Sequence, residues 1–301
     1  MKRKTMLKEI KHFLLHLRLH YQFFILSGGY LLGGLLADAM NTTQFWLQFL
    51  NVHVLLFGGA TAYNSYWDKD EGPIGGLKHP PRMTQWMHPA SLLMMAAGWT
   101  WSLQIDWHYF FIYGVSLLLF WLYSTPHARW KGDPLLSLVA IGFSTGTNSV
   151  LLGFWAAGGL FSVPILFAIV GAALILLSMY PVSQIYQYEE DQRRGDITFF
   201  GRYGLMGVKK FFTFSFTFGL ILVSAGLFGI YPYPAILFFI LGLCSFFILK
   251  GFISKLKGLK KEYKNVMKIK FFASLSFVLF LLISCFIRYE WIGSTMLTSY
   301  F

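Results

Sequence analysis

Long apolar segments place the strongest constraint on the fold of this chain. A helix needs roughly 20 mostly apolar residues to cross the hydrocarbon core of a bilayer. The segments are continuously apolar and do not alternate, as the strands of a membrane barrel would. Nine segments of about this length can be placed, at 22–39, 45–63, 90–105, 108–124, 134–157, 162–182, 211–229, 232–250 and 270–287. We therefore predict an all-α integral membrane protein with about nine transmembrane helices in one bundle.

The composition agrees with lipid as the solvent. Of the 301 residues, 56% are hydrophobic and 13% are charged, whereas a soluble domain is usually about 25% charged. No Pro-rich or Gly/Ser-rich linker divides the sequence, so we expect a single transmembrane domain over residues 1–301. The first apolar segment follows a basic N-terminus but shows no clear small-residue cleavage site, so we expect an uncleaved membrane helix.

The distribution of Lys and Arg predicts the orientation. The formal net charge of +12 would suggest a nucleic-acid partner in a soluble protein. Here the basic residues lie in loops between apolar segments, so we expect membrane lipid and no nucleic acid as a partner. If the N-terminus is cytoplasmic, nearly all basic residues fall in cytoplasmic segments, at 1–21, 64–89, 125–133, 183–210 and 251–269. The positive-inside rule therefore predicts a multi-pass protein of the cell (inner) membrane, with a cytoplasmic N-terminus and Phe301 outside.

An acidic cluster follows the second apolar segment. Asn64 and Asp68 are four residues apart, so on a helix they share one face, and Glu71 is three residues beyond Asp68. Hard oxygen ligands in this pattern suit Mg²⁺, which binds few carboxylates and shares itself with phosphate oxygens. The cluster is predicted at the cytoplasmic end of its helix.

A similar cluster follows the sixth segment, on the same predicted side of the membrane. Gln187 and Asp191 are again four residues apart, and Glu190 flanks them. The recurrence predicts two pseudo-repeated four-helix halves that face one another. One such cluster alone is typical of an ordinary solvated loop. Two clusters at matching helix ends favour a function, because ionisable groups near a membrane are costly.

Basic residues surround both acidic clusters. Acids that hold Mg²⁺, with Lys and Arg nearby, fit an anionic diphosphate. Membrane topology alone accounts for any single one of these bases. They are Lys78, Arg82, Arg129, Lys131, Arg193, Arg194 and Arg202.

With these motifs the sequence resembles the UbiA superfamily of intramembrane prenyltransferases. The first family motif reads approximately NDxxDxxxD, and Asn64 and Asp68 match it at the correct spacing. The second reads DxxxD, and Asp191 matches its last Asp. The sequence departs from these motifs at three positions, which are Ser65, Gly72 and Gln187.

Two further stretches carry the resemblance. Residues 123–126, with Lys131 after them, are similar to a tyrosine-serine-proline-lysine stretch of the family, and Arg18 resembles an Arg near the diphosphate. The resemblance implies Mg²⁺ held by Asn64, Asp68 and Asp191 as the catalytic centre. Where the motifs depart, Glu71 and Glu190 are candidates for further metal ligands.

The resemblance also implies a reaction. A prenyl group would move from an allylic prenyl diphosphate to a lipophilic acceptor inside the membrane, at a site facing the cytoplasm. The residues expected to bind the diphosphate are Arg18, Arg82, Lys131, Tyr123, Gln187 and Arg194. No sequence feature selects the acceptor.

Two alternatives stay open at this point. A multi-span transporter would also fit many apolar segments, although transporter sites lie near the midplane in broken helices, whereas these clusters are predicted at helix ends. The second alternative is a non-catalytic relative of the same superfamily. The departures at Ser65, Gly72 and Gln187 favour it, because they reduce the number of carboxylates that match the motifs.

Overall fold

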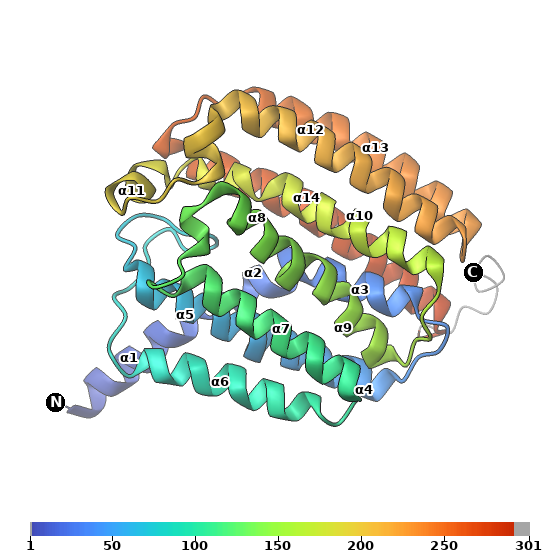
Figure 1. Ribbon diagram of the computed structural model, residues 1–301, viewed down its shortest axis with the longest axis horizontal. Coiled ribbons are helices and arrows are strands. Elements are labelled where there is room, and N and C mark those ends of the chain that lie inside the picture. Colours follow the sequence, from blue (N-terminus) through green and yellow to red (C-terminus); the bar gives the residue numbers. More distant parts are fainter. Residues whose placement is uncertain (1, 292–301) are drawn as a thin grey trace.

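The computed structural model describes residues 2–291, and within them the chain is helical apart from loops and one isolated bridge between Ile74 and Leu77 (Figure 1). The prediction of an all-α protein is confirmed. Phe301, on which the predicted position of the C-terminus depends, lies outside the described residues. The α-helices are α1 (Lys2–His16), α2 (Leu19–Tyr21), α3 (Ser27–Leu36), α4 (Thr42–Leu50), α5 (Gly59–Asp68), α6 (Met87–Ser102), α7 (Trp107–Ser124), α8 (Pro134–Ile141), α9 (Asn148–Ala157), α10 (Val163–Met179), α11 (Tyr188–Arg193), α12 (Phe199–Phe228), α13 (Pro232–Ser254) and α14 (Tyr263–Arg288).

Each of the nine predicted segments coincides with a helical stretch. Six continuous helical stretches among the described residues are long and apolar enough to cross a membrane: Thr42–Asp68, Pro134–Ala157, Val163–Gln184, Phe199–Phe228, Pro232–Ser254 and Lys260–Arg288. The segments at α3, α6 and α7 are helical but are not among these six. Nine crossings, and the two similar halves, therefore stay predictions.

Three of the long helices widen locally into π-type turns. These turns are Gln22–Leu26 between α2 and α3, Asn51–Gly58 between α4 and α5, and Gly142–Thr147 between α8 and α9. Such turns shift the register of a helix and frequently occur at functional sites. All three contribute side chains or backbone to the wall of one internal cavity, through residues such as Ile25, Phe57 and Thr145.

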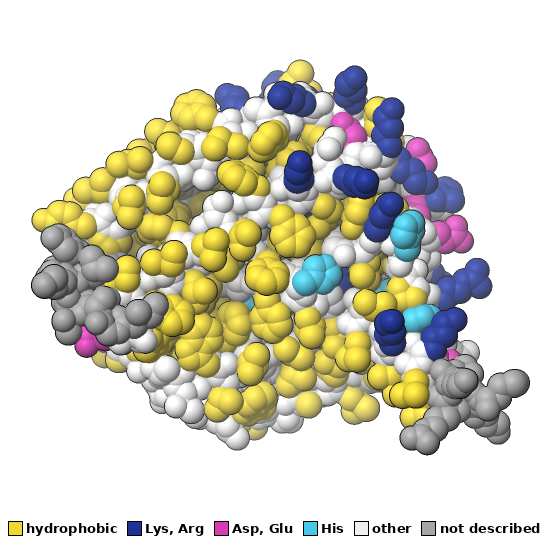
Figure 2. Space-filling view, turned by 180° about the vertical axis from the view of Figure 1, so that it is seen from behind, with side chains coloured by type: hydrophobic (Ala, Val, Ile, Leu, Met, Phe, Trp, Pro, Cys, Tyr) yellow, Lys and Arg dark blue, Asp and Glu magenta, His cyan; other side chains and the backbone are white. Residues whose placement is uncertain are grey.

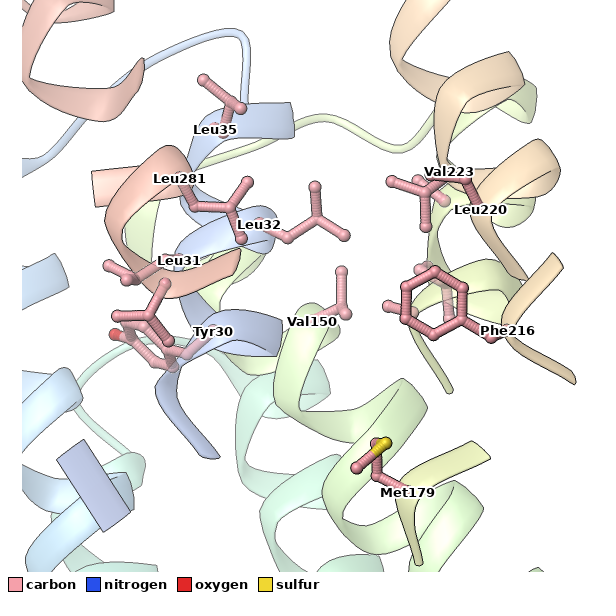
Figure 3. Close-up of a cluster of buried hydrophobic side chains, with 14 of the residues drawn as sticks. Tyr30, Leu31, Leu32, Leu35, Val150, Met179, Phe216, Leu220, Val223 and Leu281 are labelled. Atoms are coloured by element: carbon pink, nitrogen blue, oxygen red, sulfur yellow. The ribbon is translucent and has the colours of Figure 1, made fainter. Parts of the chain in front are cut away.

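The hydrophobic core joins α3 to α9, α12 and α14. Figure 3 shows Leu31 and Leu32 of α3 near Val150 and Leu281, with Leu220 of α12 on the far side of the group. Mutual burial of these side chains fixes the positions of helices that are distant in the sequence.

Helices α3 and α9 cross at backbone contact. A Cβ atom added to Gly33 would lie 2.0 Å from the carbonyl oxygen of Val150, and one added to Gly153 would lie 1.9 Å from that of Tyr30. Small residues allow such close approach, which drives helix association in membranes where lipid is as apolar as the core.

The outer surface separates charge from apolar side chains. In Figure 2, Lys and Arg side chains gather at one end of the molecule, while hydrophobic side chains cover most of the remaining face. Many of the exposed apolar side chains belong to α12 and α13, for example Phe214, Ile240 and Phe247. The six apolar helices and this surface describe a multi-pass integral membrane protein.

The α3–α9 crossing generates a stability prediction. Gly33→Ala should lower the free energy of unfolding by about 1–3 kcal/mol, because the added methyl group must push two backbones apart. Thermal unfolding of the detergent-purified protein measures this. Gly251→Ala on α13 is the matched control, because nothing lies within 4 Å of its added Cβ. Equal melting temperatures for the two variants would contradict the close crossing.

Candidate active site

One cavity of about 520 Å³ lies inside the bundle and holds most of the predicted site residues. Its apolar end is formed by aromatic and aliphatic side chains, including Phe216, Phe238 and Phe280. Its polar end carries four acidic and four basic residues: Asp68, Asp70, Asp191, Asp196, Arg18, Lys131, Arg194 and Lys270. A cavity with these two ends suits a molecule with a charged head and an apolar tail.

The first acidic cluster is positioned by the end of α5. The helix ends at Asp68 because Lys69 adopts a left-handed conformation, with φ of 51°. Helical spacing therefore does not extend to Glu71, which lies three residues beyond the last residue of the helix. Instead Asp70 lines the cavity with its side chain 3% exposed, whereas Glu71 is exposed and lies outside the cavity lining.

The loop after α5 folds over the polar end and is held by three hydrogen bonds. The Gly72 N–H donates to Glu190 Oε1 at 2.7 Å. The carbonyl of Gly75 accepts from Arg18 at 3.4 Å, and that of Gly76 lies 3.1 Å from His20 Nε2. Glu190, predicted as a metal ligand, thus fixes this loop and has only its Oε2 atom without a hydrogen-bond partner.

Asn64 and Asp68 share one hydrogen-bond network with Lys131. Asn64 Nδ2 donates to Asp68 Oδ2 at 2.9 Å, and Asn64 Oδ1 accepts from Lys131 Nζ and from Ser124 Oγ, each at 3.0 Å. The Lys131 ammonium also forms an ion pair with Asp68. The stretch at 123–131 therefore orients the first cluster, as its place in the sequence resemblance implies.

Arg194 joins the two clusters. Its Nη1 atom donates to Asp70 Oδ1 at 2.9 Å and to the carbonyl oxygen of Asp68 at 3.1 Å. Its Nη2 atom donates to Asp191 Oδ1 at 3.0 Å. The end of α5 and the short helix α11, which are far apart in the sequence, thus meet at one guanidinium group.

A further ion pair, between Arg129 and Asp196, lies beside these clusters. Arg129 donates to both carboxylate oxygens of Asp196, at 2.6 and 2.8 Å, and bidentate pairs of this kind are strong and directional. Gly195, with φ of 78°, turns the chain so that Asp196 N–H donates to the carbonyl of Asp191. Sequence reasoning did not identify Asp196 as part of this pairing, because the spacing of residues 129 and 196 contains no periodic signal.

The electrostatics of the site favour a bound cation. Burial raises the pKa of Asp191 to about 6, and the carboxylates of Asp196 and Asp68 contribute in the same direction while Arg194 opposes them. Burial and the neighbouring Asp68 also raise the pKa of Asp70. Burial lowers the pKa of Arg194, but the carboxylates of Asp68 and Asp70 outweigh it and raise that pKa. The raised pKa values of Asp70 and Asp191 therefore come mainly from burial, with neighbouring carboxylates adding to it, and a cation bound beside these two residues would stabilise their ionised forms.

The structure brings most of the predicted residues together. The cavity is lined by Asn64, Asp68, Asp191, Arg18, Lys131, Tyr123, Gln187 and Arg194. Arg82 and Glu71 are exposed and do not line it. Tyr180, which no sequence motif indicates, also lines the cavity, and its hydroxyl oxygen lies 3.0 Å from that of Tyr123.

The oxygen donors fit Mg²⁺ shared with phosphate. No group of three or more His, Cys, Asp and Glu side chains within residues 2–291 is arranged as a metal site on its own. Mg²⁺, however, is usually held by one or two carboxylates together with substrate phosphates. Asn64, Asp68 and Asp191 offer amide and carboxylate oxygens on the wall of one cavity, which is the chemistry that such sharing needs.

Comparison with known proteins identifies a family and solved structures of the same fold. A sequence model of the UbiA prenyltransferase family matches residues 24–282. A UbiA homolog from Archaeoglobus fulgidus bound to GPP and Mg²⁺ superposes with a TM-score of 0.70 at 16% sequence identity, covering 91% of this chain and 99% of that chain. The same homolog bound to DMAPP and Mg²⁺ gives a TM-score of 0.70 at 15% identity, covering 91% and 98%.

A digeranylgeranylglyceryl phosphate synthase structure gives a TM-score of 0.63 at 19% identity, covering 92% of this chain and 99% of that chain. A search of curated protein sequences returned no match. The fold and the cavity define an all-helical membrane protein with a buried acid–base site. The chain belongs to the UbiA prenyltransferase family.

The end of α5 yields a prediction about two adjacent carboxylates. Asp70→Asn should lower turnover more than about tenfold, because it removes a buried charge that pairs with Arg194. Glu71→Gln should stay within about twofold of the wild type, because an exposed carboxylate interacts weakly with its surroundings. Turnover of geranyl diphosphate by purified variants measures both, and the reverse order of effects would contradict the helix end at Asp68.

Proposed function

We propose that this protein transfers a prenyl group from an allylic prenyl diphosphate to a lipophilic acceptor within the membrane, as a single domain over residues 1–301. The observation that carries the proposal is the joining of two acidic clusters and their bases at the polar end of one cavity whose other end is apolar. The diphosphate would occupy the polar end, and the prenyl chain would extend between the helices.

The residues of the polar end act on the leaving group. The bond between C1 of the prenyl chain and the diphosphate oxygen breaks, and its electron pair leaves with the diphosphate. Lys131, Arg194 and Arg18 would bind the charge that develops on these oxygens. Donors already fixed in a site with little water stabilise such charge far more than solvent does.

Mg²⁺ is the metal that the family and the donor set imply. Asn64, Asp68 and Asp191 would hold it, and when bound it would neutralise phosphate charge as a Lewis acid. In their ionised state these carboxylates attract the metal, and Lys131 and Arg194 keep them aligned in its absence.

The prenyl cation needs protection from water until the acceptor reacts. Aromatic faces attract cations without supplying a nucleophile. Aromatic side chains of the cavity wall include Phe57, Phe120, Tyr123, Tyr180 and Tyr186. The acceptor nucleophile then forms a bond to C1 and releases its proton, which completes the transfer.

Placement at a helix end argues for catalysis over transport. Transporter sites lie near the midplane, formed by interrupted helices. Here Asp68 is the last residue of α5, Asp70 follows that helix, and Asp191 lies in the short helix α11. The alternative of a non-catalytic relative is weakened, because Asp70 and Asp196 bring two carboxylates to the cavity beyond those that match the family motifs.

The orientation proposed is the one that the Lys/Arg distribution predicts, with the polar end of the cavity facing the cytoplasm.

The shared site predicts non-additive mutations. Asp68→Ala and Asp191→Ala should each lower Mg²⁺-dependent diphosphate release and prenyl transfer from geranyl diphosphate by about 10³-fold or more, and the double variant should be little worse. Residues of one catalytic unit behave in this way, since losing one disables the other.

Purified protein at saturating Mg²⁺ is the sample, with thermal melts to exclude unfolding and Gly251→Ala as a distant control. Effects that multiply in the double variant would show that the clusters bind separate ligands. Full activity in either single variant would contradict the proposed function of these residues.

A further inference from the structure

The segment that joins α13 to α14 carries a concentration of positive charge for which the proposed reaction has no role. Seven lysines lie between Lys250 and Lys268, both included, and all of them are exposed. The same stretch contains one carboxylate, Glu262, whose side chain is buried. Its oxygens accept hydrogen bonds from the backbone N–H groups of Lys257 and Leu259 instead of pairing with an ammonium group. We call residues 250–268 the lysine-rich segment.

An open groove of about 610 Å³ runs along the surface of α12 and begins beside this segment. Lys209 and Lys210 line one end of the groove, and Ile221 lines the other. Lys209 joins the groove to the lysine-rich segment, because its ammonium group donates to the carbonyl oxygens of Ser254 at 2.8 Å and of Leu256 at 3.2 Å. The groove and the segment therefore form one continuous surface.

This α12 groove combines a positive end with an exposed apolar length. Lys210 is exposed, and no carboxylate among residues 2–291 lies within ion-pair distance of it, in contrast to Lys260. Phe214 and Phe218 are 66% and 46% exposed, and their rings stack with centroids 5.9 Å apart. Lys210 and Ile221 lie roughly 16 Å apart along the helix, which is about the depth of one leaflet of a ~30 Å hydrocarbon core.

Helix α13 depends on the surrounding lipid more than the other long helices do. It lies beside α12 along one edge of the bundle (Figure 1). Within its apolar part, 22% of α13 is buried inside the protein, against 61% for Thr42–Asp68, and this is the lowest share of the six long helical stretches. A lipid that contacts both α12 and the end of α13 would therefore stabilise this pair of helices, as any ligand of the folded state does.

The arrangement favours an anionic lipid over a soluble anion. The positive-inside rule accounts for basic residues at this end of the bundle, but it is satisfied by bases scattered over several loops. A cluster of roughly four to eight Lys or Arg residues beside a membrane helix is typical of a site for anionic lipid. A soluble phosphate would use the lysines alone, whereas a lipid also covers the exposed apolar length of the α12 groove.

We propose that the α12 groove and the lysine-rich segment form a binding site for an anionic phospholipid. Lys210 and lysines of the segment would contact the phosphate of the head group. One acyl chain would lie along Phe214, Phe218 and Ile221. None of the groove residues lines the internal cavity, so this site does not depend on the proposed reaction.

Native mass spectrometry of the full-length purified protein tests the proposal. The delipidated protein is mixed in detergent with equal amounts of dioleoyl phosphatidylglycerol and dioleoyl phosphatidylcholine, which differ in head-group charge but not in their acyl chains. The wild type should retain phosphatidylglycerol about tenfold or more over phosphatidylcholine, because several lysines act on one head group. Phosphatidylglycerol should also raise the melting temperature more than phosphatidylcholine does.

Three variants at exposed positions locate the effect. Lys210→Glu should lower the preference for phosphatidylglycerol about fivefold or more, because it reverses the charge at the head-group end. Thr217→Trp should weaken phosphatidylglycerol binding while leaving every lysine in place, because the larger side chain fills the groove. Lys78→Glu is the matched control, since Lys78 is exposed in another loop and does not line the groove, and it should keep the wild-type preference.

Four outcomes overturn the proposal. Equal retention of the two lipids by the wild type would show that the surface does not select anionic lipid. Equal losses in Lys210→Glu and Lys78→Glu would show that overall charge, and not this site, sets the preference. Unchanged binding in Thr217→Trp would exclude the groove. Displacement of phosphatidylglycerol by an equal concentration of glycerol 3-phosphate would assign the lysines to a soluble phosphate instead.

Discussion

The structure depends on the pairing of buried charges between two helix ends that are distant in the sequence. Asp70 and Asp191 lose much of their hydration at the polar end of the cavity, and Arg194 binds both. A buried carboxylate without a partner costs several kcal/mol, so removal of one ion disturbs the others. This network holds α5, α11 and the loop after α5 at the mouth of one cavity. Such pairing is a weak source of net stability, but it fixes the carboxylates of Asp70 and Asp191 around one guanidinium group.

The apolar bundle supplies the rigidity that this pairing requires. Backbone contact between α3 and α9 at Gly33 and Gly153 fixes two helices on which the cavity wall rests. The π-type turns then open space along the same wall, at positions such as Ile25 and Thr145. Charged groups line one end of the cavity and apolar groups the other. In the proposed reaction the breaking bond would lie at the boundary between them, and the apolar interior would keep water away from the prenyl cation.

Much of the fold could be predicted from length and hydropathy, because a helix that crosses lipid must be long and apolar. The segments that form α10, α12 and α13 carry this signal strongly. The segment that became α6 carries a weaker signal because it contains Ser91, Thr100 and Ser102, whose hydroxyls bond to carbonyl groups of the same helix. Asn64, Asp68, Asp191 and Lys131 could be identified from spacing and from the family resemblance.

Other parts of the site had no periodic signal. Asp70 lines the cavity in place of Glu71 because Lys69 adopts a left-handed conformation. The spacing of the acidic residues in the sequence does not reveal that conformation. The pairing of Arg129 with Asp196 and that of Lys270 with Tyr21 depend on contacts between distant helices. Such contacts arise from tertiary packing alone.

A structure of the protein with Mg²⁺ and a non-hydrolysable geranyl diphosphate analogue tests the central claim most directly. The account predicts density for one diphosphate between Asp68 and Asp191, with metal bound to oxygens from both clusters and the prenyl chain directed toward Phe216 and Phe280. A diphosphate bound to one cluster only, or outside the cavity, would contradict it.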